Sequence, residues 1–331
     1  MKKIVTIILC SALVVISGCD NYDCAQEQFR KEVNLLSNTS LVYDRQVAEV
    51  QQGGDTLFVV ASLSGSQASD ESFTVALQNS DTLLRAYNKS NFDINKARFA
   101  KYLPEECYEF PTMEMTIPAG SSKAMFPVYL KNLDKISPDS IYFLEYKIDS
   151  LKTPDCNPKK RHVLLRIHKE NYYASTQTAT YYNYTSSTII IPNTDGTSEV
   201  RRPTNSNRVF PVSENSVRLM AGDESFSDYT TALDIINKGS IILEMGEQLP
   251  ENPLAKELTI LPYKDIDVMQ LTPIGEYDNT YLLNVIRTPD GRATYYKEFR
   301  LHYKYRLQPT DRYREVNAKL RYQFNPRVEN L

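Results

Sequence analysis

The stretch NVIRTPDGRATYYKEFRLHYKYRL, residues 284–307, decides the fold class. Two extended runs flank Asp290-Gly291, a dipeptide that supplies the positive φ angles of a tight hairpin turn. In the second run apolar residues alternate with polar ones such as Arg300 and His302, so one strand face is apolar and the other polar. The sequence therefore predicts a long antiparallel hairpin with one buried face. The apolar positions are Phe299, Leu301, Tyr303, Tyr305 and Leu307.

The same two-residue period recurs along the rest of the chain. Upstream of residue 169 it appears in the short runs ESFTVALQ, TMEMTI, AMFPVYL, FLEYKI and RHVLLRIH. Downstream, Asp195-Gly196 marks another tight turn, and EVNAKLRYQF near the C-terminus alternates again. Short strands separated by turns are typical of a sandwich, and long hairpins with one apolar face can close into a barrel. We therefore expect an all-β fold class, with a β-sandwich over residues 29–169 and an antiparallel β-barrel over residues 170–331.

Two short helices are expected to interrupt the strands. One is predicted at residues 95–102, where Pro104 would end it, and the other within residues 228–239.

The chain begins with the pattern of a signal peptide. A short basic start precedes an apolar run, residues 4–16, that is too short to span a bilayer. The run ends on Gly18-Cys19, which resembles a bacterial lipobox because small residues suit a signal peptidase and the Cys19 thiol can carry lipid. We expect residues 1–18 to be removed as a lipoprotein signal peptide, Cys19 to be lipidated and residues 19–28 to form a polar tether. The alternative is an ordinary secretory signal, with Cys19 unmodified.

Composition argues against several classes of protein. The formal net charge is −3 and no block of basic residues is present, so nucleic acid is not an expected partner. Tyr is frequent at 23, Trp is absent and Gly is only 11, which favours strands over glycine-rich nucleotide-binding loops.

Three cysteines follow the predicted lipid site, namely Cys24, Cys107 and Cys156. Export permits disulfides, so a Cys107–Cys156 bridge and free, partly buried thiols both remain open. No C-x-x-C motif exists, so neither a zinc ribbon nor a thioredoxin-like site is predicted.

The common catalytic signatures are missing from the sequence. It contains no G-x-S-x-G, no Walker loop, no G-x-G-x-x-G and no H-E-x-x-H. His162 and His168 would lie roughly 20 Å apart on one strand, too far to share a metal. We interpret both, and His302, as residues on exposed strand faces. No catalytic residue, metal site or cofactor is therefore expected.

Clusters of tyrosine are the one feature that suggests ligand binding. A phenol ring offers an apolar face for stacking on a sugar and a hydroxyl for hydrogen bonding. In an all-β protein, however, tyrosines also fill cores and close barrel ends, and the members of a Tyr-Tyr pair must point to opposite faces. Both roles remain open for the candidate ligand-binding residues, which are Tyr181, Tyr182, Tyr184, Tyr295 and Tyr296. A further pair, Tyr172-Tyr173, lies in ENYYAS.

Part of the chain resembles a known family. The segment from RAYNKSNF to YFLEYKI is similar to an N-terminal immunoglobulin-like domain of unknown function in Bacteroidota lipoproteins encoded with Sus-type glycan-import systems. The matching residues are Tyr87-Asn88, Leu103-Pro104 before Tyr108, and the turn Ile117-Pro118-Ala119-Gly120. NRVFPVSENSVRLMAG and FRLHYKYRL are similar to the companion C-terminal domain. The resemblance implies an Ig-like sandwich followed by a lipocalin-like barrel, and it implies no catalytic residues.

We therefore predict a non-catalytic accessory lipoprotein, not an enzyme, held at the outer membrane and exposed on the cell surface. Its expected partners are the membrane, a polysaccharide or oligosaccharide, and components of an outer-membrane glycan importer. One alternative is a structural lipoprotein that binds a protein partner. Another is a glycan hydrolase that uses carboxylates which the sequence does not reveal.

Overall fold

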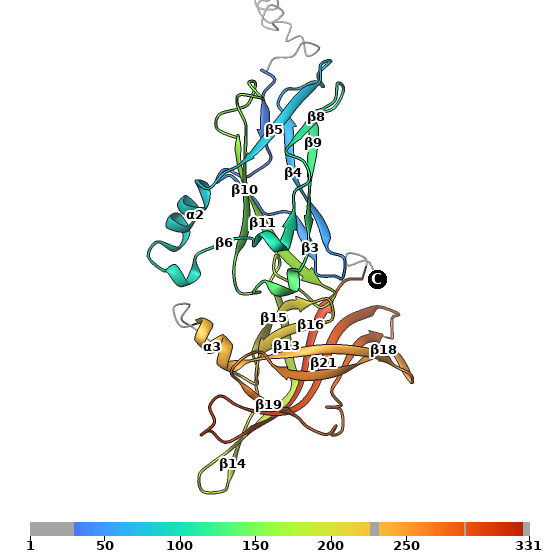
Figure 1. Ribbon diagram of the computed structural model, residues 1–331. Helices are drawn as coiled ribbons and strands as arrows, with labels where there is room; N and C mark the ends of the chain where they lie inside the picture. The colour runs from blue at the N-terminus through green and yellow to red at the C-terminus, as the bar shows by residue number, and fades with distance from the viewer. Residues whose placement is uncertain (1–29, 226–231, 288, 327–331) are drawn as a thin grey trace, which may run out of the picture.

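Two strand-rich bodies follow one another in the structure (Figure 1). The computed structural model describes residues 30–225, 232–287 and 289–326. The first body is a sandwich of two sheets, and the second is a closed antiparallel barrel of 8 strands. The predicted all-β fold class is confirmed, since the chain is 52% strand and 9% helix.

The sandwich is formed by two sheets that share one core. The smaller sheet has the order β1-β4-β9-β7, and the larger one β12-β11-β10-β5-β8, with β2 and β3 pairing with β11 and β6 pairing with β10. The smaller sheet consists of β1 (Val33–Leu35), β4 (Asp55–Leu63), β7 (Tyr108–Glu109) and β9 (Lys123–Leu130). The larger sheet consists of β2 (Val42–Tyr43), β3 (Val47–Glu49), β5 (Phe73–Asn79), β6 (Lys101–Tyr102), β8 (Glu114–Ile117), β10 (Tyr142–Ile148), β11 (His162–Asn171) and β12 (Ala174–Ser175).

Alternate side chains of these strands fill the sandwich core. Val59 on β4 and Phe126 on β9 pack in one cluster with Leu165 on β11, and each is at most 2% exposed. For β9 and β11 these are inward positions that the two-residue period predicts. The expected turn at Ile117-Pro118-Ala119-Gly120 is confirmed between β8 and β9, where Gly120 has a φ of +77°.

A helix covers the outer face of the larger sheet. Leu84 of α2 (Leu83–Phe92) packs in a second apolar cluster with Phe143 and Leu164. This cover, together with the barrel, buries the β11 face that the sequence analysis took to be exposed, and His168 is only 5% exposed. The surface interpretation of His168 is therefore wrong.

The helix begins earlier than predicted because its cap comes from another strand. The buried carboxylate of Glu145 in β10 accepts hydrogen bonds from the backbone N–H groups of Leu83 (2.9 Å) and Leu84 (3.1 Å). These bonds satisfy donors that the start of a helix leaves unpaired. The helix predicted at residues 95–102 is wrong in position, since that segment contains only the 3-10 turn Lys96–Arg98 and strand β6.

The barrel is a closed ring in which each strand pairs antiparallel with both of its neighbours. Strand β13 closes the ring by pairing with both β15 and β22, which removes exposed sheet edges. The ring strands are β13 (Thr180–Pro192), β15 (Ser206–Ser213), β16 (Ser216–Met220), β17 (Ser240–Leu249), β18 (Asn252–Pro262), β20 (Thr280–Arg287), β21 (Ala293–Arg306) and β22 (Arg314–Phe324). Two short strands attach to this ring, β14 (Ser198–Arg201) on β13 and β19 (Asp267–Gln270) on β21. Helix α3 (Ala232–Gly239) lies within the predicted segment.

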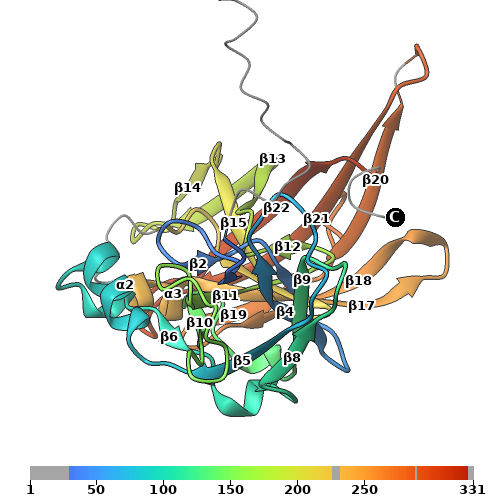
Figure 2. The same cartoon turned by 90° about the horizontal axis from the view of Figure 1, so that it is seen from above.

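The two predicted Asp-Gly hairpins are confirmed. Gly196, between β13 and β14, has a φ of +88°, and Gly291, between β20 and β21, has a φ of +84°. Seen from above, the hairpin of β20 and β21 extends well beyond the barrel wall (Figure 2).

Side chains fill the interior of the barrel. Tyr182 stacks on Phe299 with ring centroids 4.7 Å apart, and both residues are 0% exposed. On the outer face of β21, His302 is only 7% exposed and contacts the carbonyl oxygen of Thr272 at 2.6 Å and Glu315 at 3.0 Å. The predicted solvated position of His302 is wrong, because the chain between β19 and β20 folds over this face.

Polar contacts join the barrel to the sandwich. The guanidinium of Arg218 in β16 pairs with Asp139 of the sandwich at 2.5 Å, and the two side chains are only 1% and 8% exposed. At the end of β11, the Asn171 amide donates to the carbonyl oxygens of Ser213 (2.7 Å) and Ser216 (2.9 Å) in the barrel. The end of the last long sandwich strand is thus bonded directly to the barrel.

A candidate ligand cavity where the sandwich meets the barrel

The five predicted ligand-binding tyrosines do not form one platform. Tyr181 lies outside the barrel and is 47% exposed, whereas Tyr182 points inward, as adjacent residues of a strand must. The Tyr182 hydroxyl donates to the carbonyl oxygen of Tyr173 at 3.0 Å, and that of Tyr184 donates to the carbonyl oxygen of Gly222. Tyr182 and Tyr184 therefore belong to the barrel interior, whereas Tyr181 lies outside it.

The other two candidates lie on opposite faces of β21. Tyr295 is half-buried, and its ring centroid lies 6.1 Å from that of Phe324. Tyr296 is also half-buried, with the Arg321 guanidinium 5.7 Å from its ring centroid. The two rings cannot contact the same small ligand.

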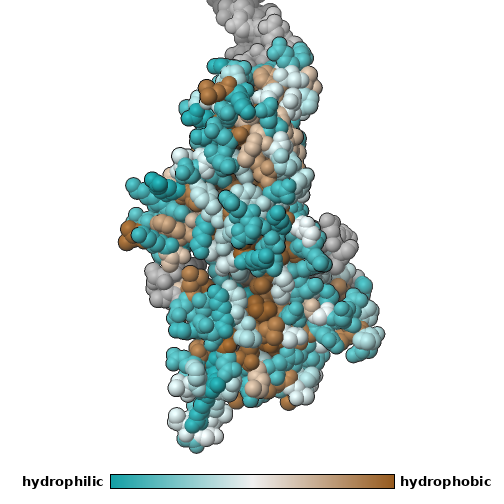
Figure 3. Space-filling view, in the orientation of Figure 1, coloured by the Kyte–Doolittle hydropathy of each residue, from teal (hydrophilic) through white to brown (hydrophobic). Residues whose placement is uncertain are grey.

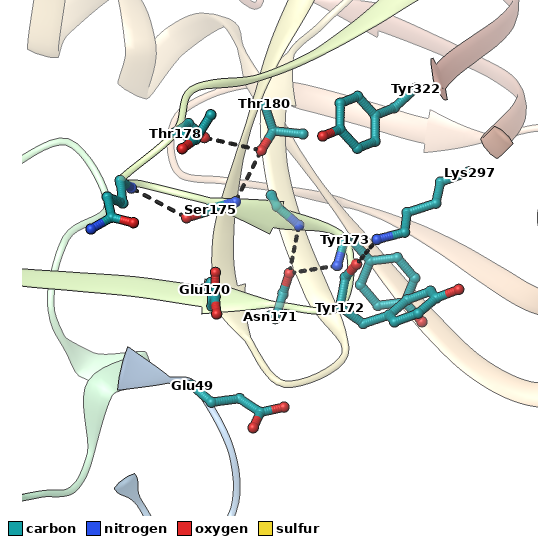
Figure 4. Close-up of a pocket in the computed structure, with 12 residues that line it drawn as sticks. Glu49, Glu170, Asn171, Tyr172, Tyr173, Ser175, Thr178, Thr180, Lys297 and Tyr322 are labelled. Carbon is teal, nitrogen blue, oxygen red and sulfur yellow. Dashed lines mark hydrogen bonds between the residues drawn. The ribbon is translucent and has the colours of Figure 1, made fainter. Parts of the chain in front are cut away.

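A cavity of about 680 Å³ lies instead at the junction of the two bodies (Figure 4). The sandwich contributes Glu49 and Glu170, from β3 and β11. The barrel contributes Lys297 and Tyr322, from β21 and β22. The chain that connects the two bodies, residues 171–180, supplies the remaining wall. This volume is within the range of about 300–1,000 Å³ that is usual for small-molecule sites.

One wall of this cavity combines aromatic rings with a cation. Tyr173 is 1% exposed and inserts into the end of the barrel, where its ring centroid lies 5.0 Å from that of Tyr281. Tyr172, its neighbour, keeps 40% of its surface exposed. The Lys297 ammonium lies 4.3 Å from the centroid of the Tyr172 ring and donates to the Tyr172 carbonyl oxygen at 2.5 Å. Cation–π attraction and this hydrogen bond hold Tyr172 in place at the cavity.

Much of the remaining lining is polar, and short-range hydrogen bonds hold part of it in place. The Asn171 side-chain oxygen accepts from the N–H groups of Tyr173 and Ala174, both at 3.0 Å, and so fixes the turn. Glu49 and Glu170 are register partners on the adjacent parallel strands β3 and β11. Their carboxylates offer hydrogen-bond acceptors to a ligand.

This arrangement suits a small hydroxyl-rich ligand. A sugar ring can stack on the exposed face of Tyr172, while carboxylate, amide and hydroxyl groups bond to its hydroxyls. Within the described residues, no group of three or more His, Cys, Asp or Glu side chains gathers in a way that could hold a metal ion. The Asp267 carboxylate accepts hydrogen bonds from Arg306 and Tyr313, each at 2.7 Å.

Sequence reasoning found only part of this cavity. The Tyr172-Tyr173 pair stands out as an aromatic cluster, but Lys297 was missed. The alternation along β21 could have indicated it, because Lys297 is two residues before the inward-facing Phe299 and therefore lies on the same strand face. A lysine at an inward position near the end of a barrel strand points to a specific partner.

The predicted lipidation site, Cys19, lies outside the described residues, as do the tether and Cys24. Cys107 and Cys156 are both free thiols, and Cys107 is buried. Burial raises the pKa of the Cys107 thiol. In the part of the chain that the structure describes, no helix is both long and apolar enough to cross a bilayer.

Family comparisons match both bodies. A family model for an N-terminal domain matches residues 29–155, and its companion for a C-terminal domain matches residues 161–321. The chain thus belongs to the Bacteroidota family of unknown function, associated with Sus-type systems, that the sequence resembles. No curated protein matches the chain.

Solved structures share the fold at low sequence identity. A protein of unknown function from Bacteroides ovatus is 16% identical, with a TM-score of 0.63 and coverage of 92% of this chain and 96% of that chain. A multidomain protein including DUF1735, also from Bacteroides ovatus, is 16% identical, with a TM-score of 0.62 and coverage of 88% and 94%. An auxiliary nutrient binding protein from Bacteroides thetaiotaomicron is 14% identical, with a TM-score of 0.60 and coverage of 87% and 94%. At these identities the similarity shows the fold alone.

Proposed function

We propose that this chain is a non-catalytic accessory lipoprotein of the cell surface that binds a glycan in the junction cavity. The observation that carries the proposal is the exposed ring of Tyr172, held by Lys297 in a cavity whose other lining residues are mostly polar. The family's association with Sus-type systems and the name of the auxiliary nutrient binding relative support an accessory role.

We propose further that Cys19 carries lipid and holds the protein in the outer membrane beside a glycan importer. The start of the described chain lies at the end of the sandwich far from the barrel (Figure 1). An anchor just before it would leave the junction cavity away from the lipid surface. Incorporation of labelled fatty acid into the wild-type protein but not into Cys19→Ser tests the anchor, and equal labelling of both would exclude Cys19 as the lipid site.

Glycan binding is tested by affinity electrophoresis and calorimetry on the chain from residue 20 onwards, which keeps both bodies whole. We expect a neutral polysaccharide or oligosaccharide to bind, and Tyr172→Ala to weaken binding by about tenfold or more, the loss expected for one stacked aromatic contact. Tyr181→Ala is the matched control, since it removes a similarly exposed tyrosine that does not line the cavity. Equal losses in both variants, or no binding to any glycan of a broad panel, would refute the proposed site.

At the junction cavity, the hydrolase alternative would use the carboxylates of Glu49 and Glu170. Register partners on one sheet face lie on the same side of a bound sugar, whereas glycosidases place their two carboxyl groups on either side of the scissile bond. Hydrolysis of a polysaccharide that Glu49→Gln or Glu170→Gln abolishes would reinstate this alternative.

The protein-partner alternative has its own structural support. Figure 3 shows brown, hydrophobic residues gathered on the front of the barrel, while the sandwich is largely teal. Large apolar side chains on the barrel, including Leu254, Leu261 and Met269, are 38% to 46% exposed. Co-purification of an importer component by a protein without glycan affinity would favour this alternative.

A further inference from the structure

A second cavity, of about 250 Å³, lies between the two bodies beside α2 and α3. The sandwich contributes Arg98, Arg166 and His168 to its lining. The barrel contributes Arg208 and an aromatic ring, that of Phe210. The first cavity does not share these residues.

Arginines give this cavity its charge. Among the described residues, neither Arg166 nor Arg208 forms a salt bridge, although the charge of Arg208 acts on Asp139 at longer range. The one carboxylate in the lining, Asp139, is already engaged by Arg218 from the neighbouring strand β16. Burial and the nearby Arg166 lower the pKa of His168 to about 4, so its ring is neutral at pH 7 and adds no charge. The terminal guanidinium nitrogens of Arg166 and Arg208 form no salt bridge with the described residues, and such nitrogens can donate hydrogen bonds to an anion in the cavity.

The arginines are also held in fixed positions. The Arg208 guanidinium lies 4.5 Å from the centroid of the Phe210 ring, and the Arg98 guanidinium lies 5.2 Å from that of Phe92. Stacking of this kind orients the planar guanidinium fork, whose geometry matches a carboxylate or sulfate group. Partial burial strengthens the attraction, because the effective dielectric constant is lower there than in water.

We propose that this cavity binds the anionic group of a small ligand, namely the carboxylate of a sugar acid or the sulfate of a sulfated sugar. The volume admits a group of about monosaccharide size but not a long oligosaccharide, since it lies below the usual range for larger ligands. The proposal does not rest on glycan binding at the junction cavity.

Binding here would stabilise the contact between the two bodies. Arg166 belongs to β11 of the sandwich and Arg208 to β15 of the barrel, so a ligand that fills the cavity would contact both bodies. A ligand that binds only the folded state raises the thermal unfolding temperature.

The test uses calorimetry and thermal unfolding on the chain from residue 20 onwards at constant ionic strength. The probes are glucuronate, glucose 6-sulfate, inorganic sulfate and glucose at millimolar concentrations. We expect glucuronate or glucose 6-sulfate to bind at one site per chain and to raise the unfolding temperature, while glucose does neither. Binding of glucuronate alone would assign a sugar acid, and binding of glucose 6-sulfate alone would assign a sulfated sugar.

Variants connect this binding to the cavity. Arg166→Met and Arg208→Met should each weaken it by about tenfold or more, as expected for a lost charge-assisted hydrogen bond. Arg208→Lys, which keeps the charge but loses the fork, should lie between wild type and Arg208→Met. Arg202→Met is the control: it makes the same charge change at an exposed residue that is not part of the lining, and it should stay within about twofold.

Three results would overturn the proposal. They are no binding of either charged sugar, binding of inorganic sulfate alone, and equal losses in the cavity variants and in Arg202→Met. Tyr172→Ala should leave anion binding unchanged, so failure of the junction cavity and failure of this one can be told apart.

Discussion

Replacing Arg218 by Met should loosen the contact between sandwich and barrel. Its guanidinium bonds to Asp139 at 2.5 Å and to the Ser240 hydroxyl at 3.1 Å, and it lies 4.4 Å from the centroid of the Phe210 ring. Because the side chains of the ion pair are only 1% and 8% exposed, removing the cation leaves a carboxylate buried without its partner. Such a loss costs about 3–5 kcal/mol, a large part of the total stability of about 5–15 kcal/mol that is usual for a domain.

The stability lost in Arg218→Met should depend on pH, because the pKa of the buried Asp139 is shifted in the folded protein. Burial raises the pKa of Asp139, even though Arg218 opposes the shift, and without Arg218 the pKa must rise further. A carboxyl whose folded-state pKa is raised binds more protons in the folded protein, so its folded state loses stability as pH rises. The penalty of Arg218→Met should therefore be smaller near pH 4.5 than near pH 7.5.

Urea unfolding followed by circular dichroism measures these free energies, since the chain has no Trp for fluorescence. A double-mutant cycle with Asp139→Asn isolates the pair, and we expect the double variant to be more stable than additivity predicts by about 1–3 kcal/mol. Lys238→Met, which breaks an ion pair with side chains 47% and 67% exposed, should cost less than about 0.5 kcal/mol. Additivity within about 0.5 kcal/mol would refute the argument that this pair couples the two bodies.

Three further perturbations test the fold. Gly54→Ala places a Cβ atom 1.9 Å from the carbonyl oxygen of Leu130 at a φ of +79°, so it should lower the free energy of unfolding in urea by about 3 kcal/mol or more. Gly53→Ala, at a φ of +117° but in open space, should lower it by only about 1–2 kcal/mol. A larger loss for Gly53→Ala than for Gly54→Ala would contradict the predicted clash. Burial lowers the pKa of His168 to about 4, so the free energy of unfolding should fall by about 3 kcal/mol as the pH drops from about 6.5 to 4. His168→Gln should flatten this dependence of stability on pH. An unchanged dependence in the variant would assign it to other groups. Glu145→Gln removes the charge from the α2 cap and should cost about 1–2 kcal/mol, with faster hydrogen exchange confined to α2; unchanged exchange there would argue against the cap.

The outcome for the tyrosines shows how far local sequence reasoning reaches. Parity along a strand predicts that Tyr181 and Tyr182 point to opposite faces, and they do. Parity does not say which residues from distant strands meet. The junction cavity joins β3 of the sandwich to β21 of the barrel, residues about 250 positions apart in the chain, so no local pattern could indicate it.

The sequence by itself determined the all-β class, the strand faces and the Asp-Gly hairpins, because side-chain alternation and turn chemistry act between near neighbours. Only the tertiary structure decided where α2 begins, because its cap is Glu145 on a strand some sixty residues away. It likewise decided that His168 and His302 are buried and that Arg166 and Arg208 line one cavity. These features depend on what covers a strand face, and that is set when the sandwich, the helices and the barrel pack together.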